Sequence, residues 1–150
     1  CVGVDCLPPA TQTGAGTFGC LVNGEPFIDN SGNFNAFYQL VDGEYYFGIQ
    51  ANDNVASIGQ IFIGSNQSQI ELNNAINLSN DSPGKFYGGI NINNLGGTFR
   101  TGNLSGLIEF SEFTINPNIV SGTFEFTIID SNTETVYEIT EGRFDTQFTQ

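Results

Sequence analysis

The C-terminal quarter of the chain has the clearest alternation of apolar and polar positions. Between Ser121 and Asp130 the apolar residues fall on every second position, which is typical of a strand with one buried face: Phe124, Phe126 and Ile128. The apolar set of the next strand changes from odd to even positions: Tyr137, Ile139, Phe144 and Phe148. A β-bulge at Glu141-Gly142 returns both sets to one face, so the pattern predicts a long, bent hairpin. A similar change near Ser111-Glu112 predicts a second bulge.

Two dipeptides predict two tighter hairpins. Asn23-Gly24 and Asp42-Gly43 are typical of two-residue type I′ turns. Around the second turn, such a connection makes pairs that are apolar on both strands: Leu40 with Tyr45, Tyr38 with Phe47, and Ala36 with Ile49. In the first hairpin Pro26 cannot donate a backbone hydrogen bond, which predicts a strand at the edge of a sheet.

About ten short strands of this kind predict an all-β fold with one antiparallel domain. The stretches before the C-terminal hairpin of 121–148 are 17–22, 25–28, 36–41, 44–51, 58–63, 67–72, 85–92, 98–101 and 107–115. A meander of this length is either closed as a barrel or folded as a β-sandwich, and periodicity does not choose between them. Residues 1–16, with two prolines and two glycines after Cys6, are expected to be an extended leader that carries the domain of 17–150 away from whatever holds Cys1. We expect 73–84 to be a loop.

Composition narrows the range of functions. The 150 residues include 16 acids and 3 basic residues, for a formal net charge of -13. A nucleic-acid-binding protein needs clustered Lys and Arg, and binding to anionic lipid needs the same, so both are disfavoured. The chain has no histidine, which excludes the common catalytic triads and most zinc sites.

The three cysteines are Cys1, Cys6 and Cys20. The simplest arrangement pairs Cys6 with Cys20 and leaves Cys1 for another role, and a bridge across so short a loop stabilises by about 3 kcal/mol in the chain-entropy model. It implies an oxidising compartment. The alternative is three free thiols in a cytosolic protein.

Both ends of the chain carry motifs that point to one family. The opening reads Leu-Pro-Pro-Ala-Thr-Gln-Thr-Gly-Ala-Gly-Thr-Phe-Gly-Cys-Leu-Val-Asn-Gly from Leu7, and the closing part reads Ser-Gly-Thr-Phe-Glu-Phe from Ser121 and Ile-Thr-Glu-Gly-Arg-Phe-Asp from Ile139. These stretches resemble an uncharacterised family of small lipoproteins from Bacteroidota, whose middle region matches only loosely. The resemblance implies that Cys1 carries lipid, with the protein at the outer membrane on its surface or periplasmic side. Two or three acyl chains on Cys1 would anchor it stably.

A few groups of residues are candidates for a binding or catalytic site. Arg143 and Asp145 share one strand face, and we expect them to form a structural ion pair. Asp29, Ser31 and Asn33 are spaced like part of a calcium loop but lack its distal glutamate. Two carboxylate pairs, Glu109 with Glu112 and Glu125 with Glu138, read as outward-facing acids rather than a catalytic set. Four tyrosines could form a sugar-binding platform but more often pack in a core: Tyr38, Tyr45, Tyr46 and Tyr87.

The sequence therefore predicts a protein without catalytic residues, resident metal or cofactor, with calcium as the alternative. The expected role is an accessory lipoprotein docked on a larger outer-membrane or cell-surface protein assembly. The alternative role is a β module that binds a glycan or a small ligand on a sandwich face or at a barrel mouth.

Overall fold

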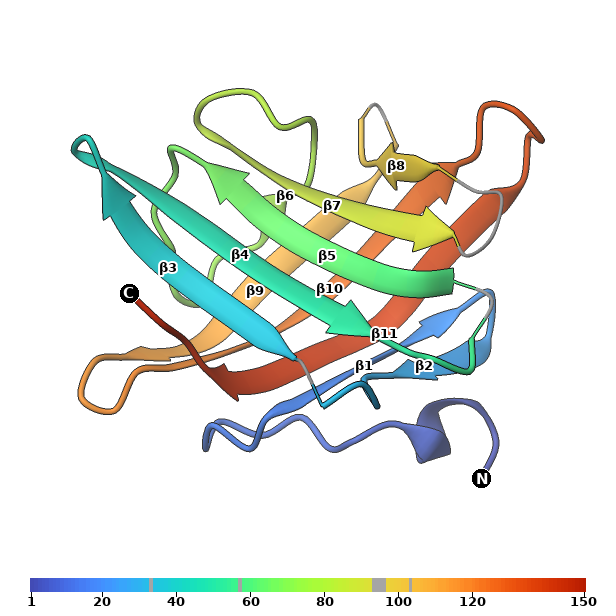
Figure 1. The fold of residues 1–150 in the computed structure, drawn as a ribbon, viewed down its shortest axis with the longest axis horizontal. Helices are drawn as coiled ribbons and strands as arrows, with labels where there is room; N and C mark the ends of the chain where they lie inside the picture. The colour runs from blue at the N-terminus through green and yellow to red at the C-terminus, as the bar shows by residue number, and fades with distance from the viewer. Residues whose placement is uncertain (33, 57, 93–96, 103) are drawn as a thin grey trace.

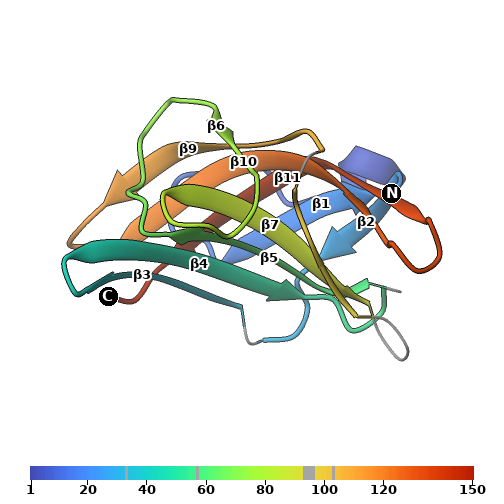
Figure 2. The same ribbon diagram turned by 90° about the horizontal axis from the view of Figure 1, so that it is seen from above.

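Two antiparallel sheets lie face to face in the computed structural model, which describes residues 1–32, 34–56, 58–92, 97–102 and 104–150 (Figures 1 and 2). The six-stranded sheet has the order β2-β1-β11-β10-β9-β6 and the five-stranded sheet the order β3-β4-β5-β7-β8. The first sheet contains β1 (Thr17–Val22), β2 (Glu25–Ile28), β6 (Ile76–Asn77), β9 (Gly106–Thr114), β10 (Ile119–Ile129) and β11 (Val136–Gln147). The second contains β3 (Asn35–Val41), β4 (Glu44–Asn52), β5 (Ile58–Asn66), β7 (Lys85–Ile92) and β8 (Thr98–Arg100). The sheets are not closed into a barrel, so of the two predicted architectures the chain adopts the sandwich.

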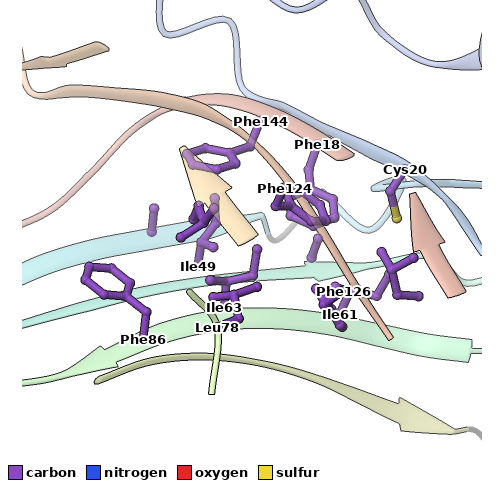
Figure 3. Packing of buried hydrophobic residues seen from close by; sticks show 14 of the residues in the cluster. Phe18, Cys20, Ile49, Ile61, Ile63, Leu78, Phe86, Phe124, Phe126 and Phe144 are labelled. Carbon is purple, nitrogen blue, oxygen red and sulfur yellow. The ribbon is translucent and has the colours of Figure 1, made fainter. Parts of the chain in front are cut away.

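Phenylalanine fills the space between the sheets. The rings of Phe47, Phe110 and Phe144 pack with centroids 5.2 to 6.4 Å apart. Figure 3 shows side chains from both sheets pointing into this layer, including Phe18, Ile61 and Phe126. Because successive residues of a strand point to opposite sides, burying these side chains leaves the intervening positions on the outer faces.

The predicted register is confirmed for the hairpin in which the turn dipeptide and the apolar pattern indicated the same residue pairs. The β3–β4 hairpin pairs Ala36 with Ile49, Tyr38 with Phe47 and Leu40 with Tyr45. Leu40 lies near the hairpin tip and stays 59% exposed, although it shares the face of buried residues. Both bulges are also found, since the register shifts between Ser121 and Gly122 against β9 and between Phe124 and Phe126 against β11.

The strand predicted at 67–72 is wrong. Of that stretch only Leu72 forms an isolated bridge, with Phe110, and Leu72 is 43% exposed. The alternation of Ile70 and Leu72 is like that of a strand, but Gln67 at the start of the stretch and Asn73 just after it have positive φ values, which interrupt extended backbone. The neighbouring stretch 73–84 is more structured than expected: it contains β6, and the side chain of Leu78 is buried.

The N-terminal segment, which was expected to be an extended leader, packs against the sandwich over part of its length. A short 3-10 helix covers Gly3–Cys6, and the side chain of Leu7 is buried. The δ-carbon of Pro8 occupies the space above Gly19, where an added Cβ would approach it to 2.7 Å. The start of the first strand at Thr17 agrees with the predicted boundary.

Gly142 in the closing hairpin is required for packing rather than for backbone geometry. The residue with positive φ in this bulge is Glu141, at 54°. Gly142 pairs with Phe124, and a Cβ added to Gly142 would lie 2.5 Å from the Phe124 ring. The ring therefore occupies the place of the missing side chain.

We predict that Gly142→Ala destabilises the fold by about 1–3 kcal/mol because the methyl group displaces the buried Phe124 ring. Chemical denaturation of the variant and the parent measures the difference. Gly102→Ala is the control, since nothing lies within 4 Å of a Cβ there. Equal effects of the two substitutions would show that the ring of Phe124 does not depend on this glycine.

Candidate ligand-binding face

The outer face of the five-stranded sheet, which lies in front in Figure 1, is built from three rows of side chains that cross the strands. The register aligns the first row as Phe37, Gly48, Gly64 and Tyr87. It aligns the second row as Asn35, Gln50, Phe62, Gly89 and Arg100. It aligns the third row as Asn52, Gln60, Asn91 and Thr98. We call these three rows the outer platform.

Glycines on neighbouring strands make room for the three aromatic rings of the outer platform. A Cβ at Gly48 would lie 2.3 Å from the Phe37 ring, and one at Gly89 would lie 2.0 Å from the Phe62 ring. A Cβ at Gly64 would lie 2.7 Å from the hydroxyl oxygen of Tyr87. Each ring thus reaches sideways over the adjacent strand. All three residues are half-buried, so their rings keep exposed surface.

Arg100 ends the strip of rings on the β8 side. Its guanidinium carbon lies 5.9 Å from the Phe62 ring centroid and 5.8 Å from that of Tyr87, within the range of cation–π attraction. The two rings themselves are 6.4 Å apart at 68°. One guanidinium nitrogen of Arg100 donates to Asp81 at 2.8 Å, and this ion pair is about half exposed to solvent.

The third row forms a ladder of side-chain hydrogen bonds. The Gln60 amide nitrogen donates to the Asn52 side-chain oxygen at 3.1 Å, and the Asn91 amide nitrogen donates to the Gln60 side-chain oxygen. The Thr98 hydroxyl donates to the Asn91 side-chain oxygen at 2.5 Å. Each amide carries two N–H groups and an oxygen with two lone pairs, so the ladder leaves donors and acceptors for a ligand.

Apart from Asn52 and Gly89, the residues of the three rows line a shallow hollow of about 340 Å³ that extends from Asn35 to Arg100. Its chemistry is an apolar strip beside a polar strip, and none of the residues aligned in the three rows is acidic. In a chain with 16 acids and 3 basic residues this composition is unusual. Such a face can pack against an apolar surface and hydrogen-bond neutral polar groups at the same time.

A comparable hollow on the other sheet has a different character. It measures about 330 Å³ and contains three carboxylates with one arginine: Glu109, Glu125, Glu141 and Arg143. Of the carboxylate pairs considered from the sequence, Glu109 and Glu112 lie opposite Thr123 and Ser121 of β10. Glu125 and Glu138 both line a further hollow of about 330 Å³ on the outer side of the same sheet. These carboxylates do lie on an outer face.

The predicted disulfide between Cys6 and Cys20 is wrong. The structure joins Cys1 to Cys6, with Cα atoms 5.1 Å apart, and leaves Cys20 as a free thiol. Cys20 lies on β1 with 0% exposure, inside the core cluster (Figure 3). Burial, with a smaller contribution from Asp53, raises the pKa of this thiol far above its usual range. Counting cysteines could not reveal that Cys20 points inward.

The predicted ion pair between Arg143 and Asp145 is also wrong. Arg143 pairs with Glu141 at 3.2 Å and donates to the Pro8 carbonyl at 3.5 Å. The Asp145 carboxylate instead accepts hydrogen bonds from the N-terminal segment, at 2.6 Å from the Thr11 hydroxyl and 2.7 Å from the Gly14 amide. Ser121 donates to it from β10 at 2.7 Å. The motifs of the two chain ends therefore meet at this carboxylate.

The candidate cation loop falls partly outside the described residues, because Asn33 is among those not described. Asp29 accepts hydrogen bonds from the Asn52 backbone amide at 2.7 Å and from the Ser31 hydroxyl at 3.2 Å. This carboxylate thus holds the β2–β3 connection against the end of β4. No group of three or more metal-ligating side chains occurs among the described residues.

Of the four tyrosines, only Tyr87 belongs to the outer platform. Tyr38 and Tyr45 stack against each other at 4.7 Å on the inner side. Tyr46 pairs with Gln39 of β3, outside the three rows. Phe37 and Phe62 were missed as candidates, although the predicted inward set of Ala36, Tyr38 and Leu40 already implied that Phe37 points outward.

Neither protein-family models, curated proteins nor solved structures gave a match to this chain. The resemblance to Bacteroidota lipoproteins therefore stays a prediction from its motifs. Within the described part of the chain, no helix has the length and apolar character needed to cross a membrane.

Asp145→Asn should destabilise the fold by about 1.5–3 kcal/mol at neutral pH, the range for hydrogen bonds to a charged group. Burial by itself would raise the pKa of Asp145, but the hydrogen bonds from Thr11, Ser121, Thr13 and Gly14 outweigh it and hold the pKa well below its usual range. A lowered folded-state pKa stabilises above the unfolded value of about 3.9, and this stabilisation is lost as the pH falls below it.

Denaturation of parent and Asp145→Asn from pH 7 to pH 3 measures this difference. The difference in free energy of unfolding between the two proteins should decrease as the pH falls. The control is Asp42→Asn, an exposed turn position with positive φ that both residues tolerate. A gap that stays constant down to pH 3 would contradict the assigned role of the carboxylate.

Proposed function

We propose that this protein is a non-enzymatic binding module that presents the outer platform to a glycan. The observation that carries the proposal is the set of three aromatic rings lying over glycines beside a ladder of amides. Glycines under the rings let the aromatic strip extend over neighbouring strands.

The chemistry of a sugar fits both parts of the outer platform. One side of a pyranose ring carries C–H groups, whose slightly positive hydrogens are attracted to the negative face of an aromatic ring. Its rim carries hydroxyls, which donate and accept hydrogen bonds as the side chains of Gln60 and Asn91 do. Arg100 adds further donors beside Phe62 and Tyr87.

The alternative of a small apolar ligand inside the sandwich receives no support from the core. The inner side chains of both sheets pack against one another, with Phe18 and Phe124 at 5.1 Å and Phe47 and Phe110 at 5.2 Å between ring centroids. A well-packed interior of this kind resists insertion of further groups. A glycan on the outer face requires no such rearrangement.

Affinity electrophoresis through gels containing single soluble polysaccharides, neutral and acidic, tests the proposal. The parent domain should be retarded by at least one of them. Tyr87→Ala and Phe62→Ala should each weaken that retardation by about tenfold or more, equivalent to 1.4 kcal/mol of binding free energy. Tyr137→Ala is the matched control, because it removes a half-buried ring from β11, away from the outer platform.

Thermal unfolding establishes that the variants are folded. No retardation by any polysaccharide in the panel, or equal retardation of Tyr87→Ala, Phe62→Ala and the parent, would overturn the proposal.

The location predicted from the sequence is kept as part of the proposal: a lipid on Cys1 would hold the module at the outer membrane, beside a larger protein assembly. What supports it is the resemblance of the opening motif. In the structure the Cys1 sulfur is bonded to Cys6. A sulfur in a disulfide cannot also hold a thioether-linked lipid, so the lipid-bearing form is one in which this bond is absent.

We predict that Cys1→Ala moves the protein expressed in its own cells from the membrane to the soluble fraction. Cys6→Ala is the control, because it removes the disulfide but leaves Cys1 to carry lipid. If Cys1→Ala stays with the membranes through a carbonate wash, the anchor is not on Cys1.

A further inference from the structure

The groups of the outer platform have an order across the sheet that restricts the shape of a glycan. The Phe37 ring lies over β4, the Tyr87 side chain reaches β5, and the Phe62 ring lies over β7. Arg100 follows on β8. The apolar strip therefore runs perpendicular to the strands and is continued from one strand to the next.

The polar strip runs in the same direction. The ladder of Asn52, Gln60, Asn91 and Thr98 crosses β4, β5, β7 and β8 at one level of the sheet. Adjacent rows are two residues apart along each strand, which is about 6.8 Å. Two of the three rings, Phe37 and Tyr87, belong to the first row and lie about 13.6 Å from the ladder of the third. A ligand that contacts both strips therefore lies along the second row, across the strands.

The spacing of the strands also matches an extended sugar chain. Neighbouring strands are about 4.8 Å apart, a spacing similar to the length of one pyranose unit in a ribbon-like β-1,4-linked chain. From β3 to β8 there are four such steps, so the outer platform spans about 19 Å and accommodates about four units. A chain that coils, as α-1,4-linked glucans do, would leave this straight track.

Charge restricts the ligand further. Arg100, the only basic residue aligned in the three rows, is already paired with Asp81 at 2.8 Å. The remaining residues of the rows are neutral, and the whole chain carries a net charge of -13. An acidic polysaccharide would be repelled by the protein and would have to compete with Asp81 for the single cation.

Building on the proposed function, we infer that the ligand is a neutral, linear polysaccharide of β-1,4-linked pyranoses that lies across the strands from β3 to β8. Its C–H faces pack on Phe37, Tyr87 and Phe62, and its hydroxyls bond the amide ladder. Arg100 is then a specificity-determining residue that donates hydrogen bonds to hydroxyls at the β8 end while Asp81 holds its guanidinium over the rings.

Isothermal titration with defined oligosaccharides tests the inference. The probes are cello- and xylo-oligosaccharides of two to six units, maltohexaose as the coiling chain, and oligogalacturonate as the acidic chain. Affinity for one of the β-1,4 series should rise about tenfold or more from two to four units and change little beyond four. It should change less than about twofold between 50 and 500 mM NaCl, because no net charge is neutralised.

Arg100→Gln should lower the affinity for the four-unit ligand by about tenfold. It should lower the affinity for the two-unit ligand less, because that ligand occupies only part of the outer platform. Lys85→Gln is the control, because it removes a cation from β7 outside the three rows. Tyr87→Ala should weaken every ligand that binds. The last result tests the proposed function separately from the class of ligand.

Preference for oligogalacturonate, with an affinity that falls steeply as salt increases, would overturn the inference about the ligand. If Tyr87→Ala also lost that binding, the proposed function would still stand. Preference for maltohexaose, or affinity that does not rise with chain length, would overturn it in the same way. Absence of binding to every probe, combined with absence of retardation by any polysaccharide, would overturn both.

Discussion

Three positions without a Cβ determine the character of the outer face. Gly48, Gly64 and Gly89 lie on three neighbouring strands, each beneath a ring from the next strand. Any other residue at these positions would stand upright and push the ring away from the sheet, since real Cβ atoms do not approach other heavy atoms within 3.0 Å. Each ring fills the space that a side chain would otherwise occupy above the glycine. The apolar strip of the outer platform and the position of Arg100 over two rings both depend on this arrangement.

The core explains why the rings are on the outside at all. Alternation along β3, β4 and β5 places Ala36, Ile49 and Ile61 inward, so the residues between them must face solvent or a partner. An outer face left to solvation alone would carry charged side chains, as the acidic face of the other sheet does. A neutral polar ligand with one apolar side needs a surface that offers both aromatic rings and neutral hydrogen-bonding groups. The half-buried phenylalanines and tyrosine beside neutral amides form such a surface.

Asp145 links the two ends of the chain in the folded protein. Its carboxylate gathers donors from Thr11, Thr13 and Gly14, while the backbone of Thr149 pairs with Ala36 and Tyr38 on β3. The first contact fixes the N-terminal segment on the six-stranded sheet, and the second ties the C-terminal end to the edge of the five-stranded sheet. The outer platform lies on the other side of the sandwich from the N-terminal segment (Figure 2).

The pattern of apolar and turn residues predicted those parts of the fold that depend on residues close together in the sequence. The β3–β4 register followed from the Asp42-Gly43 turn, and both bulges followed from a change in parity of buried residues. Pairings that depend on the fold could not be obtained this way: Cys1 with Cys6, Arg143 with Glu141, and Asp145 with Thr11. The outer platform was missed for the same reason, because Phe62 and Gly89 are 27 positions apart and only strand order makes them neighbours.

The most direct test of the account is a map of ligand contacts by NMR, with a ¹⁵N-labelled domain titrated with the tightest-binding neutral oligosaccharide. If the glycan lies on the outer platform, the largest shifts will occur at the backbone amides of Gly48, Gly64 and Gly89 and at the side-chain amides of Gln50, Gln60 and Asn91. Shifts concentrated on the six-stranded sheet around Glu109, Glu125 and Arg143, with those glycines unaffected, would contradict it.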